Sequence, residues 1–130
     1  MKLQRFAVRL SAVAAIERLS AAAAAVPMGL VAHINGQTNC AKKGIDVPPD
    51  QILEIFRPDF AVKVWAADKR AGIDIPIRIH VCEHEGKTWV ACRMPSWIFE
   101  PYDSSALDAI GSELDAIFAR ILAALDDVKE

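Results

Sequence analysis

The sequence lacks the features that define several large classes of protein. It has no run of about 20 apolar residues, the length that a membrane-spanning helix needs. It also has no basic excess, because 15 lysines and arginines are offset by 17 aspartates and glutamates. Proteins that bind the phosphate backbone of DNA or RNA usually carry such an excess. The sequence therefore predicts neither a membrane protein nor a nucleic-acid-binding protein.

Cysteines are few, and their spacing is irregular. Cys40, Cys82 and Cys92 form no CxxC pair, and three is an odd number, so a disulfide framework is not expected. The N-terminal segment does not fit a secretory signal, since Arg9 and Glu17 interrupt its apolar stretch. Reduced thiols are typical of the cytoplasm, so we predict a cytoplasmic protein.

Motifs that would indicate a cofactor or a nucleophile are missing as well. The sequence contains no GxGxxG or Walker loop for phosphate groups and no GxSxG turn for a catalytic serine. It therefore identifies no cofactor and no reaction.

What is present is the pattern of one globular α+β domain spanning residues 1–130. The apolar share is 53% and the charged share is 25%, which is ordinary for a chain with a single core. Alternating and helical periodicities predict a curved antiparallel sheet of about five strands with the helices mainly on one face. The expected strands are 3–10, 29–34, 51–56, 75–84 and 87–94, and the expected helices are 12–25, 37–43, 59–69 and 105–128.

The strand predicted from Ile75 has the clearest pattern in the chain. Its odd positions through Val81 are branched and apolar, whereas its even positions include Arg78, His80 and Cys82. Since alternate side chains of a strand point to opposite faces, the odd set should lie in the core and the even set on the other face. A turn at residues 85–86 should then lead into the partner strand.

Three segments together resemble a known family. They are Ile52-Leu-Glu-Ile-Phe-Arg-Pro58, the stretch from Ala71 to Glu83 with its Gly-Ile-Asp-Ile-Pro start, and Gly86-Lys-Thr-Trp-Val90. The pattern resembles the domain of unknown function 302 family, and the resemblance extends upstream through Ala41-Lys-Lys-Gly-Ile45.

The sequence departs from that family at two positions. Arg57 precedes Pro58 where asparagine is frequent, and Cys82 stands where an aromatic residue is common. A binding role that depends on this asparagine in relatives is therefore not expected here. The resemblance implies a curved antiparallel sheet and a chain that is often a homodimer, but it supplies no activity and no catalytic residue.

Our first hypothesis is a homodimeric small-ligand-binding or accessory protein. The expected pocket lies between the third strand, the helix after Pro58 and the loop around residues 97–102. Its candidate ligand-binding residues are Glu54, Arg57, Trp97 and Tyr102. The second copy would pack on the sheet face opposite the core, where we also place Arg5, Arg9, Arg78, His80 and the interface-favouring Trp89.

Two alternatives belong to other classes of function. In one, His80 and Cys82 hold a transition metal, because imidazole and thiolate are good ligands for zinc or copper. His84 follows at the turn, where we expect it to be solvated. In the other, a small enzyme uses Cys40, placed near the start of a short helix, or Glu54, which stands alone in an apolar strand.

Overall fold

Five strands form one antiparallel sheet in the order β1-β5-β4-β3-β2 in the computed structural model, which describes residues 2–130. The strands are β1 (Gln4–Val8), β2 (Gly29–Asn35), β3 (Asp50–Phe56), β4 (Ile77–His84) and β5 (Lys87–Cys92). The α-helices are α1 (Ala12–Ala25), α2 (Gly36–Ala41), α3 (Pro58–Ala67), α4 (Pro95–Phe99) and α5 (Ser105–Leu122). Three 3₁₀ segments are η1 (Lys69–Asp74), η2 (Glu100–Tyr102) and η3 (Ala123–Val128).

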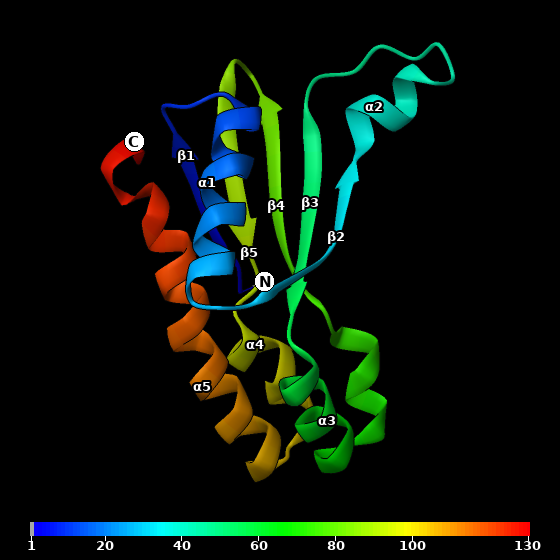
Figure 1. The fold of residues 1–130 in the computed structure, drawn as a ribbon, viewed down its shortest axis with the longest axis vertical. Helices are drawn as coiled ribbons and strands as arrows, with labels where there is room; N and C mark the ends of the chain where they lie inside the picture. Colours follow the sequence, from blue (N-terminus) through cyan, green and yellow to red (C-terminus); the bar gives the residue numbers. More distant parts are fainter. Residues whose placement is uncertain (1) are drawn as a thin grey trace.

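The connection from β1 to β2 runs from one edge of the sheet to the other, and the three later strands fill the positions between these two edges. Helix α1 connects the two edge strands, β1 and β2, and β3, β4 and β5 then lead back to β1 (Figure 1). Every strand pair is antiparallel. The predicted α+β class and five-stranded sheet are therefore confirmed.

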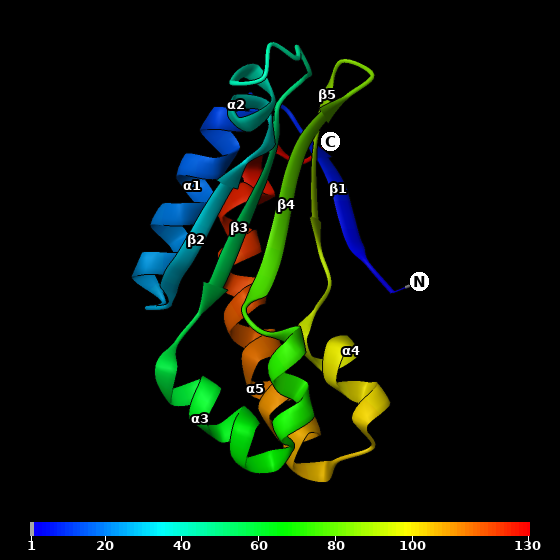
Figure 2. The same ribbon diagram turned by 90° about the vertical axis from the view of Figure 1, so that its right-hand side faces the viewer.

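Helices α1 and α5 cover one face of the sheet, and the opposite face is open in the described part of the chain (Figure 2). Leu19 of α1 and Leu114 and Phe118 of α5 are fully buried and belong to the same apolar core as Leu53 of β3. Burying such a side chain contributes about 1.5–3 kcal/mol. Helices α3 and α4 lie beyond one end of the sheet, next to the start of α5 (Figure 1).

Strand β4 shows the predicted alternation. Ile77, Ile79 and Val81 are fully buried, whereas Arg78 is exposed and His80 is half-buried. The two-residue turn at 85–86 then joins β4 to β5, and both of its residues have positive φ. This backbone is the one favoured in tight hairpins, because its twist matches that of the flanking strands.

Several predicted boundaries differ from the structure. The helix expected over 105–128 changes after Leu122 into the 3₁₀ segment η3, and β4 begins at Ile77, two residues later than expected. The loop expected around residues 97–102 is instead α4 followed by η2. Pro95 occupies the first turn of α4, a position where proline costs no hydrogen bond, and α4 packs against α5. Tertiary packing thus stabilises a helix that is too short to be evident in the sequence.

Helix α2 begins as predicted but ends early. The side chain of Asn35 accepts a hydrogen bond from the backbone N–H of Thr38, which is the N-cap interaction expected there. The helix stops at Ala41, so Cys40 lies at its C-terminal end and not near its start. The expected position of Cys40 near the start of a short helix is therefore wrong.

A membrane-crossing helix is not found among residues 2–130, since none of their helices combines the required length with sufficient apolar character.

Candidate functional site

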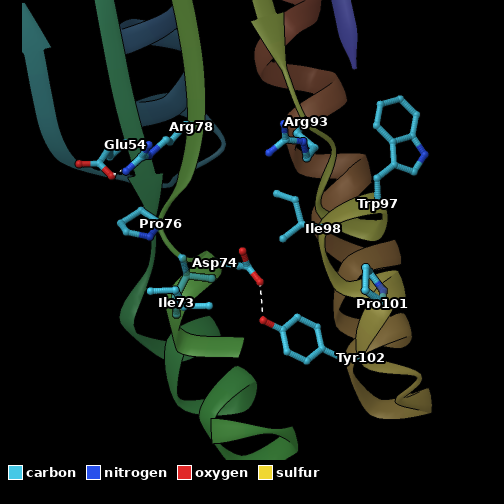
Figure 3. Close-up of a pocket in the computed structure, with 11 residues that line it drawn as sticks. Glu54, Ile73, Asp74, Pro76, Arg78, Arg93, Trp97, Ile98, Pro101 and Tyr102 are labelled. Atoms are coloured by element: carbon cyan, nitrogen blue, oxygen red, sulfur yellow. Dashed lines mark hydrogen bonds and ion pairs between the residues drawn. The ribbon is translucent and has the colours of Figure 1, made fainter. Parts of the chain in front are cut away.

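A pocket of about 490 Å³ lies at the end of the open sheet face, and we call it the Tyr102 pocket. Two walls enclose it (Figure 3). One wall comes from the ends of β3 and β4 and from η1. The other comes from the segment that follows β5, including α4 and η2. Its lining residues are Glu54, Ile73, Asp74, Ile75, Pro76, Arg78, Arg93, Trp97, Ile98, Pro101 and Tyr102.

Helix α5 positions the second wall through two contacts with α4. The carboxylate of Asp115 accepts a hydrogen bond from the backbone N–H of Ser96 at 2.9 Å. This N–H lies in the first turn of α4, where backbone N–H groups have no acceptor within the helix. Gly111 lets the two helices approach closely, because a Cβ at this position would lie 2.9 Å from the Cα of Ser96. The placement of Trp97 and Ile98 therefore depends on two residues of α5 outside the pocket.

Two polar pairs hold three of the charged side chains that line the Tyr102 pocket. Arg78 on β4 donates through Nε to the carboxylate of Glu54 on β3 at 3.3 Å, across directly paired positions. The hydroxyl of Tyr102 donates to the carboxylate of Asp74 at 2.5 Å and so joins the two walls (Figure 3). This hydrogen bond, and next the desolvation of the phenol, raise the pKa of Tyr102.

Three of the four predicted ligand-binding residues line this pocket, and the fourth does not. Glu54 lies with Trp97 and Tyr102 in the lining, although it precedes both by more than 40 residues in the sequence. Arg57 lines a separate apolar cavity of about 310 Å³ beside Trp65, which we call the Trp65 pocket. Residues 75–76 line both cavities, so the single predicted pocket is two pockets that share this segment.

Arg57 is held by partners within the chain. Its guanidinium donates to the carboxylate of Asp59 at 2.7 Å and to the carbonyl of Pro27 at 2.8 Å, and it also lies over the ring of Phe60. The hydrogen bond from Arg57 is the main cause of a lowered pKa of Asp59. These contacts tie the start of α3 to the segment before β2.

Sequence reasoning missed several residues of the Tyr102 pocket. Asp74 ends η1 and Arg93 follows β5, and neither lies in a motif that indicates a site. Arg78 was assigned to the open face but not to a pocket. The alternation of β4 was sufficient to place Arg78 on this face, whereas no local pattern indicates that η1 and α4 close over it.

A second polar cluster lies farther along the open face, on β3 and β4. Asp50 pairs directly with Cys82, and His80 projects from the same face two residues before the cysteine. The His80 Nε2 atom lies 2.8 Å from a carboxylate oxygen of Asp50. Desolvation, and next the charge of Asp50, raise the pKa of the Cys82 thiol, while Arg5 acts in the opposite direction. His84 is exposed beside the turn, as we expected.

The other two cysteines occupy different environments. Cys92 on β5 is buried in the core, and desolvation raises the pKa of its thiol to about 12. Such a thiol stays protonated and unreactive at neutral pH. Cys40 is half-buried at the end of α2, away from both pockets.

Two residues assigned to the open face have partners within the chain. The guanidinium of Arg5 lies 3.8 Å from the centre of the Trp89 ring and covers part of this aromatic side chain. Arg9, by contrast, donates to the carbonyl of Lys129 at 2.7 Å, beyond the end of β1. Its guanidinium is thus tied to the C-terminal segment at the edge of the sheet, which corrects its expected place on the open face.

These features define a small α+β domain with an open antiparallel sheet and a polar pocket at the end of that sheet. The family described as domain of unknown function DUF302 matches residues 4–127, so the chain belongs to this family. A solved structure of an uncharacterized conserved protein DUF302 from Bacillus stearothermophilus superposes with a TM-score of 0.82 and 23% identity, covering 98% of each chain. At this identity the likeness shows the fold alone. No curated protein matches the sequence.

Proposed function

We propose that this protein binds a small organic molecule in the Tyr102 pocket. The observation that carries the proposal is the pocket itself. Its volume of about 490 Å³ lies within the range of about 300–1,000 Å³ that is typical of small-molecule sites. Six of its lining residues are apolar and five carry polar groups, so it offers a ligand both apolar contact and hydrogen-bonding partners.

The lining supports a ligand with an apolar body and a polar end. Trp97, Ile98 and Pro101 offer apolar surface on one wall. Toward the sheet, the pair of Glu54 and Arg78 offers both an acceptor and a donor of hydrogen bonds. Because acids and arginines both line the pocket, we expect orientation of the ligand by hydrogen bonding to matter more than its net charge.

The probe 1-anilinonaphthalene-8-sulfonate tests this proposal, since it is a small amphipathic aromatic anion. Its fluorescence should rise on binding to the native protein, and Trp97→Ala should weaken the binding about five- to tenfold through lost aromatic contact. Trp65→Ala is the matched control, because Trp65 lines the other pocket. Binding that survives Trp97→Ala and is lost in Trp65→Ala would contradict the assignment to the Tyr102 pocket.

A second experiment searches for the natural ligand. Small molecules extracted from the purified protein would be compared by mass spectrometry between the wild type and Trp97→Ala. A compound present in the wild type and depleted in the variant, but retained in Trp65→Ala, would identify the chemistry that the Tyr102 pocket selects.

We also propose that two copies associate through the open face of the sheet. This face carries Trp89, Ile52 and the partly exposed Ile34, and aromatic and aliphatic groups on an uncovered sheet favour a partner. Sedimentation velocity at several concentrations should detect a dimer that Trp89→Lys shifts toward monomer. The control Trp65→Lys, on α3, should leave it unchanged. A wild-type protein that is monomeric at all concentrations would refute the dimer.

A further inference from the structure

The polar cluster of Asp50, His80 and Cys82 has the arrangement of a metal site. The donor atoms of these three side chains all lie within 4.8 Å of one another. They come from two adjacent strands in fixed register, since Asp50 is paired with Cys82 and His80 is two residues away on the same face. A carboxylate, an imidazole and a thiol are thus held together by the backbone of the sheet and not by a mobile loop.

We propose that Asp50, His80 and Cys82 bind one transition-metal ion, with Zn²⁺ as the best match. Thiolate and imidazole ligands select Zn²⁺ or copper over Mg²⁺ and Ca²⁺, which prefer oxygen ligands alone. An ionised carboxylate and a thiolate together offset the two charges of the ion. On binding, the Cys82 thiol loses its proton to solvent and the sulfur forms a bond to the metal.

The distances need only small adjustments to accommodate the ion. Zinc–ligand bonds of about 2.0–2.3 Å place tetrahedral donors about 3.3–3.8 Å apart. No two donors are more than 4.8 Å apart, so none has to approach another by more than about 1.5 Å, while Asp50 and His80, now 2.8 Å apart, must separate by about 0.5 Å. Asp50 is exposed, and His80 and Cys82 are half-buried, so rotation of their side chains can supply these shifts without movement of the strands.

Three protein ligands leave one position of a tetrahedral ion for water. Structural zinc sites are closed by four protein ligands, whereas sites with three retain an exchangeable fourth ligand. Within one copy of the chain no helix of the described residues covers this face of the sheet, so that position is open to water (Figure 2). The alternative is a solvated surface pair of His80 and Asp50, which would contribute little to stability and bind no metal.

Titration of the full-length reduced protein with Co²⁺, a spectroscopic substitute for Zn²⁺, distinguishes these two possibilities. We expect one equivalent to produce the visible bands of tetrahedral Co²⁺ and a thiolate-to-cobalt charge-transfer band in the near ultraviolet. Cys82→Ser should abolish the charge-transfer band, and Zn²⁺ should displace the Co²⁺. His80→Ala should weaken binding more than about tenfold, because even the loss of a second-shell partner costs about 10–100-fold.

Matched controls are available within the chain. Cys40→Ser removes a half-buried thiol outside the cluster, and His84→Ala removes the next histidine along β4, so both should leave the spectrum and affinity unchanged. Circular dichroism of each variant confirms that the fold is retained. The proposal is overturned if the wild type shows no charge-transfer band, if the band persists in Cys82→Ser, or if Cys40→Ser removes it.

Discussion

Replacing Gly111 by alanine should destabilise this protein, although alanine is the better helix former. In the interior of a helix the exchange normally stabilises by about 0.8–1 kcal/mol. Here the new Cβ would lie 2.9 Å from the Cα of Ser96 and 3.2 Å from its backbone nitrogen. The clashing atoms belong to the backbone of α4, so no side-chain rotation relieves the contact, and α4 has to move away from α5.

The magnitude follows from the balance of these two effects. Forcing extra volume into a well-packed site costs about 1–3 kcal/mol, and the helix propensity of alanine offsets about 1 kcal/mol of that. The net loss in the free energy of unfolding is therefore between about 0 and 2 kcal/mol. A loss of about 1 kcal/mol lowers the urea midpoint by about 0.3–1 M.

Urea unfolding measures this loss, with Ala109→Gly as the control. Ala109 is exposed on the same helix, so this exchange reports helix propensity alone and should cost about 1 kcal/mol. Because α4 carries Trp97, Gly111→Ala should also weaken binding of 1-anilinonaphthalene-8-sulfonate to the Tyr102 pocket. A Gly111→Ala variant that is more stable than the wild type by about 1 kcal/mol would refute the reasoning.

Three further predictions follow from local features. Glu85→Asn should stabilise the hairpin by a few tenths of a kcal/mol in urea unfolding, since Glu85 has φ 52° and asparagine tolerates positive φ; a loss of stability would contradict this. Asp74→Asn should lower the pKa of Tyr102, the single tyrosine, in an ultraviolet titration. An unchanged pKa would show that the hydrogen bond to Asp74 is not what raises it. Stability should fall as the pH rises from about 9 toward 12, because the unfolded chain releases the Cys92 proton near 9 and the folded chain retains it to about 12. In urea unfolding, Cys92→Ala should reduce the fall of the unfolding free energy between about pH 9 and 12. An unchanged fall would show that other groups cause it.

Local patterns were sufficient to predict most of the secondary structure. The helix over residues 12–25 has the predicted bounds, Asn35 caps α2, and residues 85–86 form the predicted turn. The alternation of β4 also predicted which side chains face the core. Each of these features depends on residues that are near neighbours in the sequence, so the physical cause is present in the pattern itself.

The candidate sites depended on contacts that no local pattern contains. Sequence reasoning selected Glu54, Trp97 and Tyr102 for one pocket, but it also included Arg57, which the fold directs into another cavity. It did not identify Asp74, whose carboxylate reaches Tyr102 only because η1 and η2 lie opposite each other. Helix α4 was likewise missed, because its stability comes from packing on α5.

The sequence by itself determined that one domain forms, which residues make most of its strands and helices, and which face of β4 is apolar. The tertiary structure alone decided that Asp50 joins His80 and Cys82, since this juxtaposition requires the register between β3 and β4. It also decided that the predicted pocket is divided at residues 75–76. The physical reason is the same in both cases: the periodicity of a segment sets the direction of its side chains, whereas the packing of distant segments sets which side chains meet.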